Sequence, residues 1–223
     1  MPALNNIESV LFDLDGTLLD TAPDMVDAIN ILRSELGLDP KPYEHLRNTV
    51  SHGGAALIRK GLDIQDEHPE FQNYLDKFLN LYRQNIANKT NYFAGMEQVL
   101  TKLEDSNIQW GIVTNKPHWL TSELVGKLNI SERTSCIVSG DTLEQRKPHP
   151  APLLHACELL NVDPTKTIYV GDAQRDIEAG NNASMHTFIA MFGYIDEEDH
   201  PEQWNADGII NSPVEILDLI DLG

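Results

Sequence analysis

The sequence has few aromatic residues and few basic ones. Phe, Trp and Tyr make up 7% of its 223 residues, which does not favour a surface for stacking nucleic-acid bases. Lys and Arg number 16 against 35 Asp and Glu, so the formal net charge is −19. A protein this acidic repels nucleic acid and anionic lipid unless it has a basic patch, and no run of Lys or Arg forms one. We expect neither partner, and an anionic ligand would need placed cations or a metal ion.

Cysteine and long hydrophobic runs are also scarce. Cys136 lies in an apolar run and Cys157 in an apparent helix. Two buried thiols are the preferred interpretation, and a disulfide is the alternative. No segment reaches the roughly 20 apolar residues of a membrane span, and residues 1–9 lack the features of a secretory signal. The sequence therefore predicts a soluble, cytoplasmic protein.

The sequence does show a regular alternation of short apolar runs with amphipathic stretches. The apolar runs are 7–12, 108–113, 135–139, 167–170, 187–190 and 208–210. The amphipathic stretches include 96–105, 117–128, 151–160 and 213–222. This alternation predicts an α/β fold with a Rossmann-like parallel sheet and helices on both faces. Ligands of such sheets bind at the carboxyl ends of the strands.

One region breaks the alternation. Between residues 18 and 89 the apolar spacing is helical, clearest over 22–36 and 71–86, and no strand is convincing. A helical insert after the first strand would lie over the carboxyl edge of the sheet, where a lid belongs. We therefore expect a helical cap domain at 18–89 and a core domain made of 1–17 and 90–223.

Two aspartates follow the first apolar run, Asp13 directly and Asp15 two residues later. Gly16 allows a sharp backbone turn, so both carboxylates can face the same edge. Carboxylates this close repel each other unless a cation lies between them or one is protonated, and Mg²⁺ prefers carboxylate oxygens. A calcium loop, the main alternative, needs glycine at its sixth position, where this chain has Leu18. A magnesium site is therefore the favoured hypothesis.

Polar side chains also stand at or near the ends of later strands. Thr114 and Asn115 precede a helix and suit a phosphate oxygen, although such residues also serve as plain helix caps. Lys147 stands among prolines that would aim it, although a solvated lysine is the simpler interpretation in isolation. Asp172 follows a strand, with Asp176 one helical turn later, as metal ligands or as a helix cap. Because all these groups fall near strand ends, we expect them to gather at one site.

In this order the groups resemble the four motifs of the haloacid dehalogenase superfamily of aspartate-nucleophile phosphatases. The motifs match 12–17, 113–115, 147–148 and 171–176, and the resemblance covers nearly the whole chain. Segments 18–24 and 50–54 are similar to the phosphoglycolate phosphatase group. A closer likeness, to N-acetylmuramic acid 6-phosphate phosphatases of bacterial cell-wall recycling, lies in 92–96, 110–117, 193–195 and 204–207. One departure is Ala173, where many relatives carry Ser or Asp.

The resemblance implies a Mg²⁺-dependent phosphatase with Asp13 as the covalent nucleophile. Asp15 would give a proton to the leaving group and later take one from water. Whether its neighbours keep Asp15 protonated beforehand is open, since nearby carboxylates and the metal act in opposite directions. Asp13, the Asp15 backbone carbonyl and Asp172 would hold Mg²⁺, and Asp176 would orient the water around it.

The resemblance also assigns contacts to the phosphate and to the rest of the substrate. Three residues would hold phosphate oxygens: Thr114, Asn115 and Lys147. Of these, Thr114 and Lys147 also count among the catalytic groups. Three cap residues would approach the organic half of the substrate: His52, Gly53 and Gly54. The alternative for these three is that they merely begin a cap helix.

Several alternatives stay open from the sequence. A phosphomutase shares the nucleophile and the acid–base aspartate, but it should need a bisphosphate activator. A non-catalytic phospho-ligand-binding module could use the same fold. The expected partner is a small phosphorylated metabolite, and both 2-phosphoglycolate and N-acetylmuramic acid 6-phosphate carry a carboxylate and a phosphate. The sequence leaves open whether the protein is a monomer or a homodimer.

Overall fold

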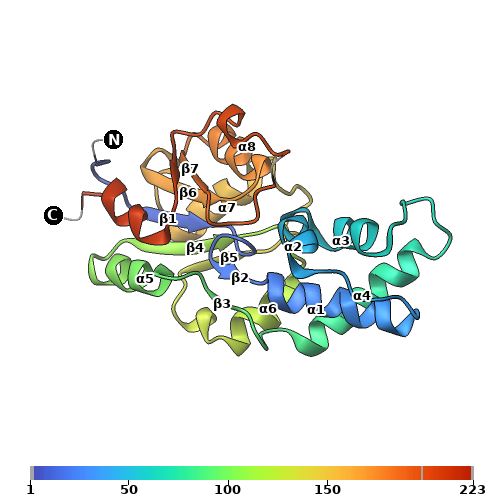
Figure 1. The fold of residues 1–223 in the computed structure, drawn as a ribbon. Coiled ribbons are helices and arrows are strands. Elements are labelled where there is room, and N and C mark those ends of the chain that lie inside the picture. The colour runs from blue at the N-terminus through green and yellow to red at the C-terminus, as the bar shows by residue number, and fades with distance from the viewer. Residues whose placement is uncertain (1–2, 197, 222–223) are drawn as a thin grey trace.

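A six-stranded parallel sheet forms the centre of the computed structural model, which describes residues 3–196 and 198–221 (Figure 1). The strand order is β5-β4-β1-β6-β7-β8. The strands are β1 (Ser9–Phe12), β4 (Gln109–Val113), β5 (Cys136–Val138), β6 (Thr167–Gly171), β7 (His186–Ala190) and β8 (Gly208–Ile210). Each coincides with an apolar run of the sequence, so the predicted α/β parallel-sheet fold is confirmed.

The two faces of the sheet are buried by different helices. Alternate residues of β1 separate them, since Val10 and Phe12 pack in one apolar cluster and Leu11 packs in another. Side chains of α5 and α6 join the first cluster, and side chains of α7 and α8 join the second. These helices are α5 (Met96–Asp105), α6 (His118–Lys127), α7 (Ala151–Leu160) and α8 (Gln174–Asn182). Helices on both faces explain why the strands read as continuous apolar runs.

A group of helices, the cap helices, lies beyond the carboxyl end of β1 (Figure 1). It comprises α1 (Ala22–Glu35), α2 (Tyr43–Leu46), the 3₁₀ helix η1 (Arg47–His52), α3 (Gly53–Leu62) and α4 (Phe71–Asn85). The chain enters and leaves it through an antiparallel ribbon of β2 (Leu19–Asp20) and β3 (Asn91–Tyr92). The expectation of no strand within 18–89 was therefore wrong at β2, because a two-residue strand carries no periodicity. The domain boundaries themselves stay a prediction.

The remaining helices are short 3₁₀ helices, three of them before a strand and the last of them after β8. They are η2 (Ile130–Glu132), η3 (Pro164–Lys166), η4 (Pro201–Gln203) and η5 (Pro213–Leu219). Within the amphipathic stretch 213–222, Pro213–Leu219 forms a 3₁₀ helix, and the end of this helix returns to the N-terminal segment, where the Leu4 amide donates to the Leu219 carbonyl. Cys136 and Cys157 are buried free thiols, as preferred from the sequence. Among the described residues, none of the helices combines the length and apolar character that crossing a bilayer requires.

Candidate active site

The predicted polar residues meet because three neighbouring strands end at one edge. Phe12 pairs with Ile112 of β4 and Val170 of β6. The residues that follow these strands therefore lie side by side, which brings Asp13 close to the ends of β4 and β6. Asp13 is almost fully buried, with 3% of its surface exposed. A carboxylate so placed needs nearby positive charge.

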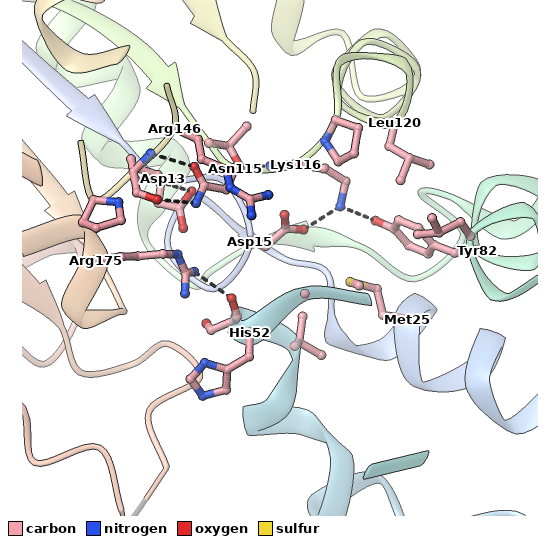
Figure 2. Close-up of a pocket in the computed structure, with 18 residues that line it drawn as sticks. Asp13, Asp15, Met25, His52, Tyr82, Asn115, Lys116, Leu120, Arg146 and Arg175 are labelled. Atoms are coloured by element: carbon pink, nitrogen blue, oxygen red, sulfur yellow. Dashed lines mark hydrogen bonds and ion pairs between the residues drawn. The ribbon is translucent and has the colours of Figure 1, made fainter. Parts of the chain in front are cut away.

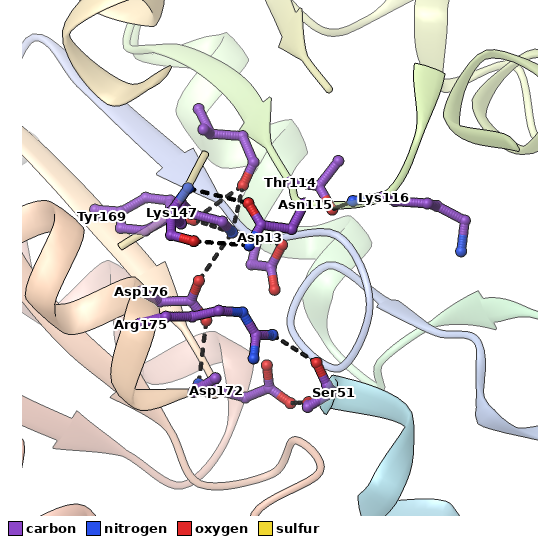
Figure 3. A network of polar contacts seen from close by, with 12 residues as sticks. Asp13, Ser51, Thr114, Asn115, Lys116, Lys147, Tyr169, Asp172, Arg175 and Asp176 are labelled. Carbon is purple, nitrogen blue, oxygen red and sulfur yellow. Dashed lines mark hydrogen bonds and ion pairs between the residues drawn. The ribbon is translucent and has the colours of Figure 1, made fainter. Parts of the chain in front are cut away.

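Lys147 supplies part of that charge from the centre of the site (Figure 3). Its ammonium nitrogen lies 2.9 Å from Asp13 Oδ1 and 2.8 Å from Asp176 Oδ1. It also donates to the Val113 carbonyl at 2.8 Å and to the Tyr169 hydroxyl at 2.7 Å. Because Lys147 is only 2% exposed, these four oxygens replace its water shell. The ammonium is thereby fixed beside Asp13, not solvated.

Three buried carboxylates form a cluster suited to a divalent cation. Ligand oxygens of Asp13, Asp172 and Asp176 lie within 4.8 Å of one another. Asp172 Oδ1 is buried and has no hydrogen-bond partner among the described residues. Burial, together with the charges of Asp13 and Asp176, raises the pKa of Asp172 to about 7. A bound cation would give the unpartnered oxygen a ligand and offset the repulsion, so the residues present fit Mg²⁺.

Gly16 makes room for this cluster. Its φ is +86°, which favours glycine, and a Cβ at this position would lie 2.1 Å from Asp172 Oδ2. The glycine that follows the two aspartates is therefore required by both the turn and the approach of Asp172. This explains the Asp-x-Asp-Gly pattern of the sequence physically.

The Asp15 side chain points away from the three-carboxylate cluster and toward the cap helices. Its Oδ1 accepts hydrogen bonds from the Thr21 hydroxyl at 2.6 Å and the Lys116 ammonium at 2.8 Å. Lys116 also donates to the hydroxyl of Tyr82 on α4 at 3.1 Å (Figure 2). The Asp15 side chain therefore contributes no oxygen to the three-carboxylate cluster. Asp15 lines the same cavity as Asp13.

Thr114 and Asn115 lie at the end of β4, as expected, and line the cavity. The Asn115 side chain accepts from the Lys147 amide at 3.1 Å and donates to the Lys147 carbonyl at 2.9 Å. Thr114 Oγ1 accepts from the Lys116 amide at 3.1 Å. Asn115 thus fixes the backbone that carries Lys147, while the Thr114 hydroxyl proton is available to a ligand.

The segment Arg47–His52 ties the cap helices to the carboxylate cluster. The Ser51 hydroxyl donates to Asp172 Oδ2 at 2.5 Å. Arg175, at the start of α8, donates to the Ser51 carbonyl at 2.6 Å (Figure 3). The Tyr194 amide donates to the same Asp172 oxygen at 2.8 Å. Asp172 is therefore oriented by one contact from the cap side and one from the core.

The three predicted cap residues occupy different environments. His52 is half-exposed and lines the cavity, and its pKa is lowered by burial although Asp199 opposes the shift. Gly53 also lines the cavity, with a φ of +80°. Gly54 packs against α4, where an added Cβ would lie 3.2 Å from Phe78 and 3.3 Å from Leu79. His52 and Gly53 are thus placed to meet a ligand, and Gly54 lies between helices.

The cavity over the site has a volume of about 420 Å³. Its walls include four residues to which the sequence argument gave no role: Ser51, Tyr82, Lys116 and Arg175. Lys116 and Arg175 stand inside the matched segments 110–117 and 171–176, so attention to those cations would have found them. Ser51 and Tyr82 reach the site only because the cap helices pack on the core. The spacing of residues along the sequence does not predict this packing.

Removing the Ser51 hydroxyl should weaken cation binding. We expect Ser51→Ala to bind Mg²⁺ roughly 10-fold more weakly, because outer contacts that orient a metal ligand typically contribute 10- to 100-fold in affinity. The measurement is the rise in unfolding temperature with Mg²⁺ concentration. Ser51→Thr keeps a hydroxyl and serves as the matched control. Equal affinities for Ser51→Ala and the unmodified protein would contradict the orienting role.

The chain is similar to known proteins in both sequence and fold. The family model described as haloacid dehalogenase-like hydrolase matches residues 10–190. The chain is 36% identical to the N-acetylmuramic acid 6-phosphate phosphatase of Pseudomonas aeruginosa, over 96% of this chain and 95% of that protein. It is 40% identical to a phosphoglycolate phosphatase of Xylella fastidiosa, over 92% and 89% of the two chains. The crystal structure of a predicted phosphoglycolate phosphatase from Haemophilus somnus matches with a TM-score of 0.84 and 25% identity, over 96% and 98%.

Proposed function

Because this chain belongs to the haloacid dehalogenase-like hydrolases, we propose that it is a magnesium-dependent phosphomonoesterase that forms an aspartyl-phosphate on Asp13. The observation that carries the proposal is the pairing of a buried nucleophile with a cation site. Asp13 shares Lys147 with Asp176 and lies within 4.8 Å of a carboxylate oxygen of Asp172, whose Oδ1 has no hydrogen-bond partner among the described residues. This arrangement offers an oxygen nucleophile and positive charge at one point, which phosphoryl transfer requires.

The residues divide the reaction between them. Asp13 attacks phosphorus, its bond to the phosphoryl group forms as the ester P–O bond breaks, and Asp15 gives its proton to the leaving oxygen. Water then attacks the acyl phosphate while Asp15 takes a proton, which releases phosphate and restores Asp13. Thr114 and Lys147 hold phosphoryl oxygens, and Asn115 keeps Lys147 in place.

Magnesium would be held by Asp13, Asp172 and the Asp15 backbone carbonyl, with Asp176 outside this ligand set. When bound, the cation neutralises charge on the phosphoryl group and on the attacking carboxylate. The pairing of Asp176 with Lys147 leaves it placed to orient water around the cation.

The cavity supports a leaving group larger than a two-carbon acid. Its volume of about 420 Å³ lies within the range of roughly 300–1,000 Å³ typical for drug-sized ligands. Apolar side chains and cations both line it, including Met25, Leu79 and Leu120 with Arg146 and Arg175. We place N-acetylmuramic acid 6-phosphate before 2-phosphoglycolate as substrate, since it fills more of this space and is also anionic. A cytoplasmic location and a monomeric or dimeric state stay predictions.

Phosphate release from a substrate panel tests the proposal. With Mg²⁺, we expect kcat/KM for N-acetylmuramic acid 6-phosphate to exceed that for 2-phosphoglycolate and for hexose phosphates by about 10-fold or more, equal to roughly 1.4 kcal/mol of differential transition-state binding. The reverse preference would make the protein a phosphatase of 2-phosphoglycolate. Turnover that depends on a bisphosphate activator would indicate a mutase, and no turnover at all would contradict the phosphatase assignment.

A further inference from the structure

Lys116 is a buried cation at the edge of the cavity that the mechanism above does not use. Only 8% of it is exposed, and its ammonium lies between Asp15 on the core and Tyr82 on α4 (Figure 2). Although burial opposes it, the neighbouring Asp15 carboxylate and Tyr82 raise the pKa of Lys116. The side chain is therefore a permanent positive charge, and it points away from Asp13 and Lys147 (Figure 3).

The partner on the cap side is a neutral phenol held in a fixed place. Tyr82 is fully buried, and burial raises its pKa to about 12. Its hydroxyl accepts from Lys116 at 3.1 Å, and the ammonium lies 4.6 Å from the ring centroid. Because Tyr82 belongs to α4, this contact exists only while α4 lies against the core. Lys116 thus joins the cap to Asp15 directly.

Among the described residues, the side-chain hydrogen bonds to the Asp15 carboxyl group all reach one of its two oxygens. Lys116 and Thr21 both donate to Oδ1, at 2.8 Å and 2.6 Å. Within residues 3–196 and 198–221, no side chain donates to Asp15 Oδ2. Two donors on one oxygen fix the rotation of the carboxyl group and leave the other oxygen for the substrate.

We infer that Lys116 is a positioning residue for Asp15, holding Oδ1 so that Oδ2 meets the leaving oxygen, and that Tyr82 sets Lys116 when α4 closes over the site. The inference rests on the proposed function, in which Asp15 is the proton donor. In the step concerned, the ester P–O bond breaks and the proton moves from Asp15 Oδ2 to the departing oxygen. The Asp15 carboxylate that results forms an ion pair with Lys116, whose ammonium already contacts Oδ1.

If Lys116 positions Asp15, the loss of kcat/KM on replacing Lys116 should depend on the leaving group of the substrate. A poor leaving group needs the proton more than a good one does, and kcat/KM reports only the steps up to leaving-group departure. Phenyl phosphate and 4-nitrophenyl phosphate form a matched pair, since nitrophenolate leaves far more easily. We expect Lys116→Met to lower kcat/KM for phenyl phosphate roughly 50-fold and for 4-nitrophenyl phosphate less than about 3-fold, against the 10²–10⁴-fold range of general acid catalysis as a whole.

Two further variants keep the inference falsifiable if Lys116→Met folds poorly. Tyr82→Phe removes only the hydroxyl and should show the same selectivity with a smaller loss, about 5-fold for phenyl phosphate. Asp15→Asn should be at least as selective as Lys116→Met, and Lys102→Met on the exposed face of α5 should match the unmodified protein.

The outcomes separate the inference from the proposed function. Equal losses on both esters in Lys116→Met and Tyr82→Phe, with selective loss in Asp15→Asn, would overturn the positioning role alone. Equal losses in Asp15→Asn would overturn the proton-donor role as well. Selective loss in all three variants would support a contact from the cap through Lys116 to Asp15.

Discussion

Asp13→Asn is expected to lower kcat for phosphate release by about 10³-fold or more, since it replaces the attacking carboxylate by an amide. The variant should fold, because the amide has the shape of the carboxylate and removes one charge from a cluster of three buried carboxylates. The introduced amide retains an oxygen that can accept from Lys147, which the carboxylate of Asp13 contacts at 2.9 Å. Loss of turnover without loss of folding is therefore the expected result.

The covalent step can be followed directly. Rapid quenching of the unmodified protein with substrate should reveal a phosphorylated chain that hydroxylamine cleaves, and Asp13→Asn should show none. Asp105→Asn, an exposed carboxylate on α5, is the matched control and should behave as the unmodified protein. Substantial turnover by Asp13→Asn, with mass spectrometry excluding deamidation back to Asp, would contradict the covalent mechanism.

Residues at strand ends could be predicted because parallel strands bring their carboxyl ends to one edge. Asp13, Thr114 and Asp172 each directly follow a buried strand, so local pattern was enough to expect them together. Their contacts were less predictable. Asn115 was expected to hold phosphate, yet its amide is engaged with the backbone of Lys147. The sequence pattern predicts at which strand end a residue lies, but it does not predict the hydrogen-bond partners of the side chain.

Contacts between the cap helices and the core could not be predicted from the sequence for a different reason. Tyr82 meets Lys116, and Ser51 meets Asp172, only because separate helices fold over the edge of the sheet. The helical spacing of 71–86 correctly predicted α4, but helical spacing cannot say what α4 covers. Gly54 illustrates the same limit, since its lack of a side chain accommodates α4. The cap thus contacts both Asp172 and, through Lys116, Asp15.

The cation-free protein should lose stability as the pH rises. The pKa of Asp172 is about 7 in the folded protein, against about 3.9 for an unfolded Asp. Between these values the folded state keeps a proton that the unfolded state has released, so the free energy of unfolding falls with rising pH. From pH 4 to 8 the loss from this group alone reaches up to about 4 kcal/mol, given the difference between these two pKa values. Urea unfolding with a chelator present, across this pH range, measures it.

The proposed magnesium ion should offset much of this loss, because it would bind the ionised carboxylates only in the folded state. At pH 8 and 100 times its dissociation constant, the cation should add about 2.7 kcal/mol to the free energy of unfolding. Asp172→Asn removes both the group that titrates and a ligand of the cation, so it should flatten the pH dependence and abolish most of the Mg²⁺ response. Asp105→Asn, which is exposed, should keep both. A cation-free protein equally stable at pH 5 and 8, or an Asp172→Asn variant with a full Mg²⁺ response, would place the cation elsewhere than at the cluster of Asp13, Asp172 and Asp176.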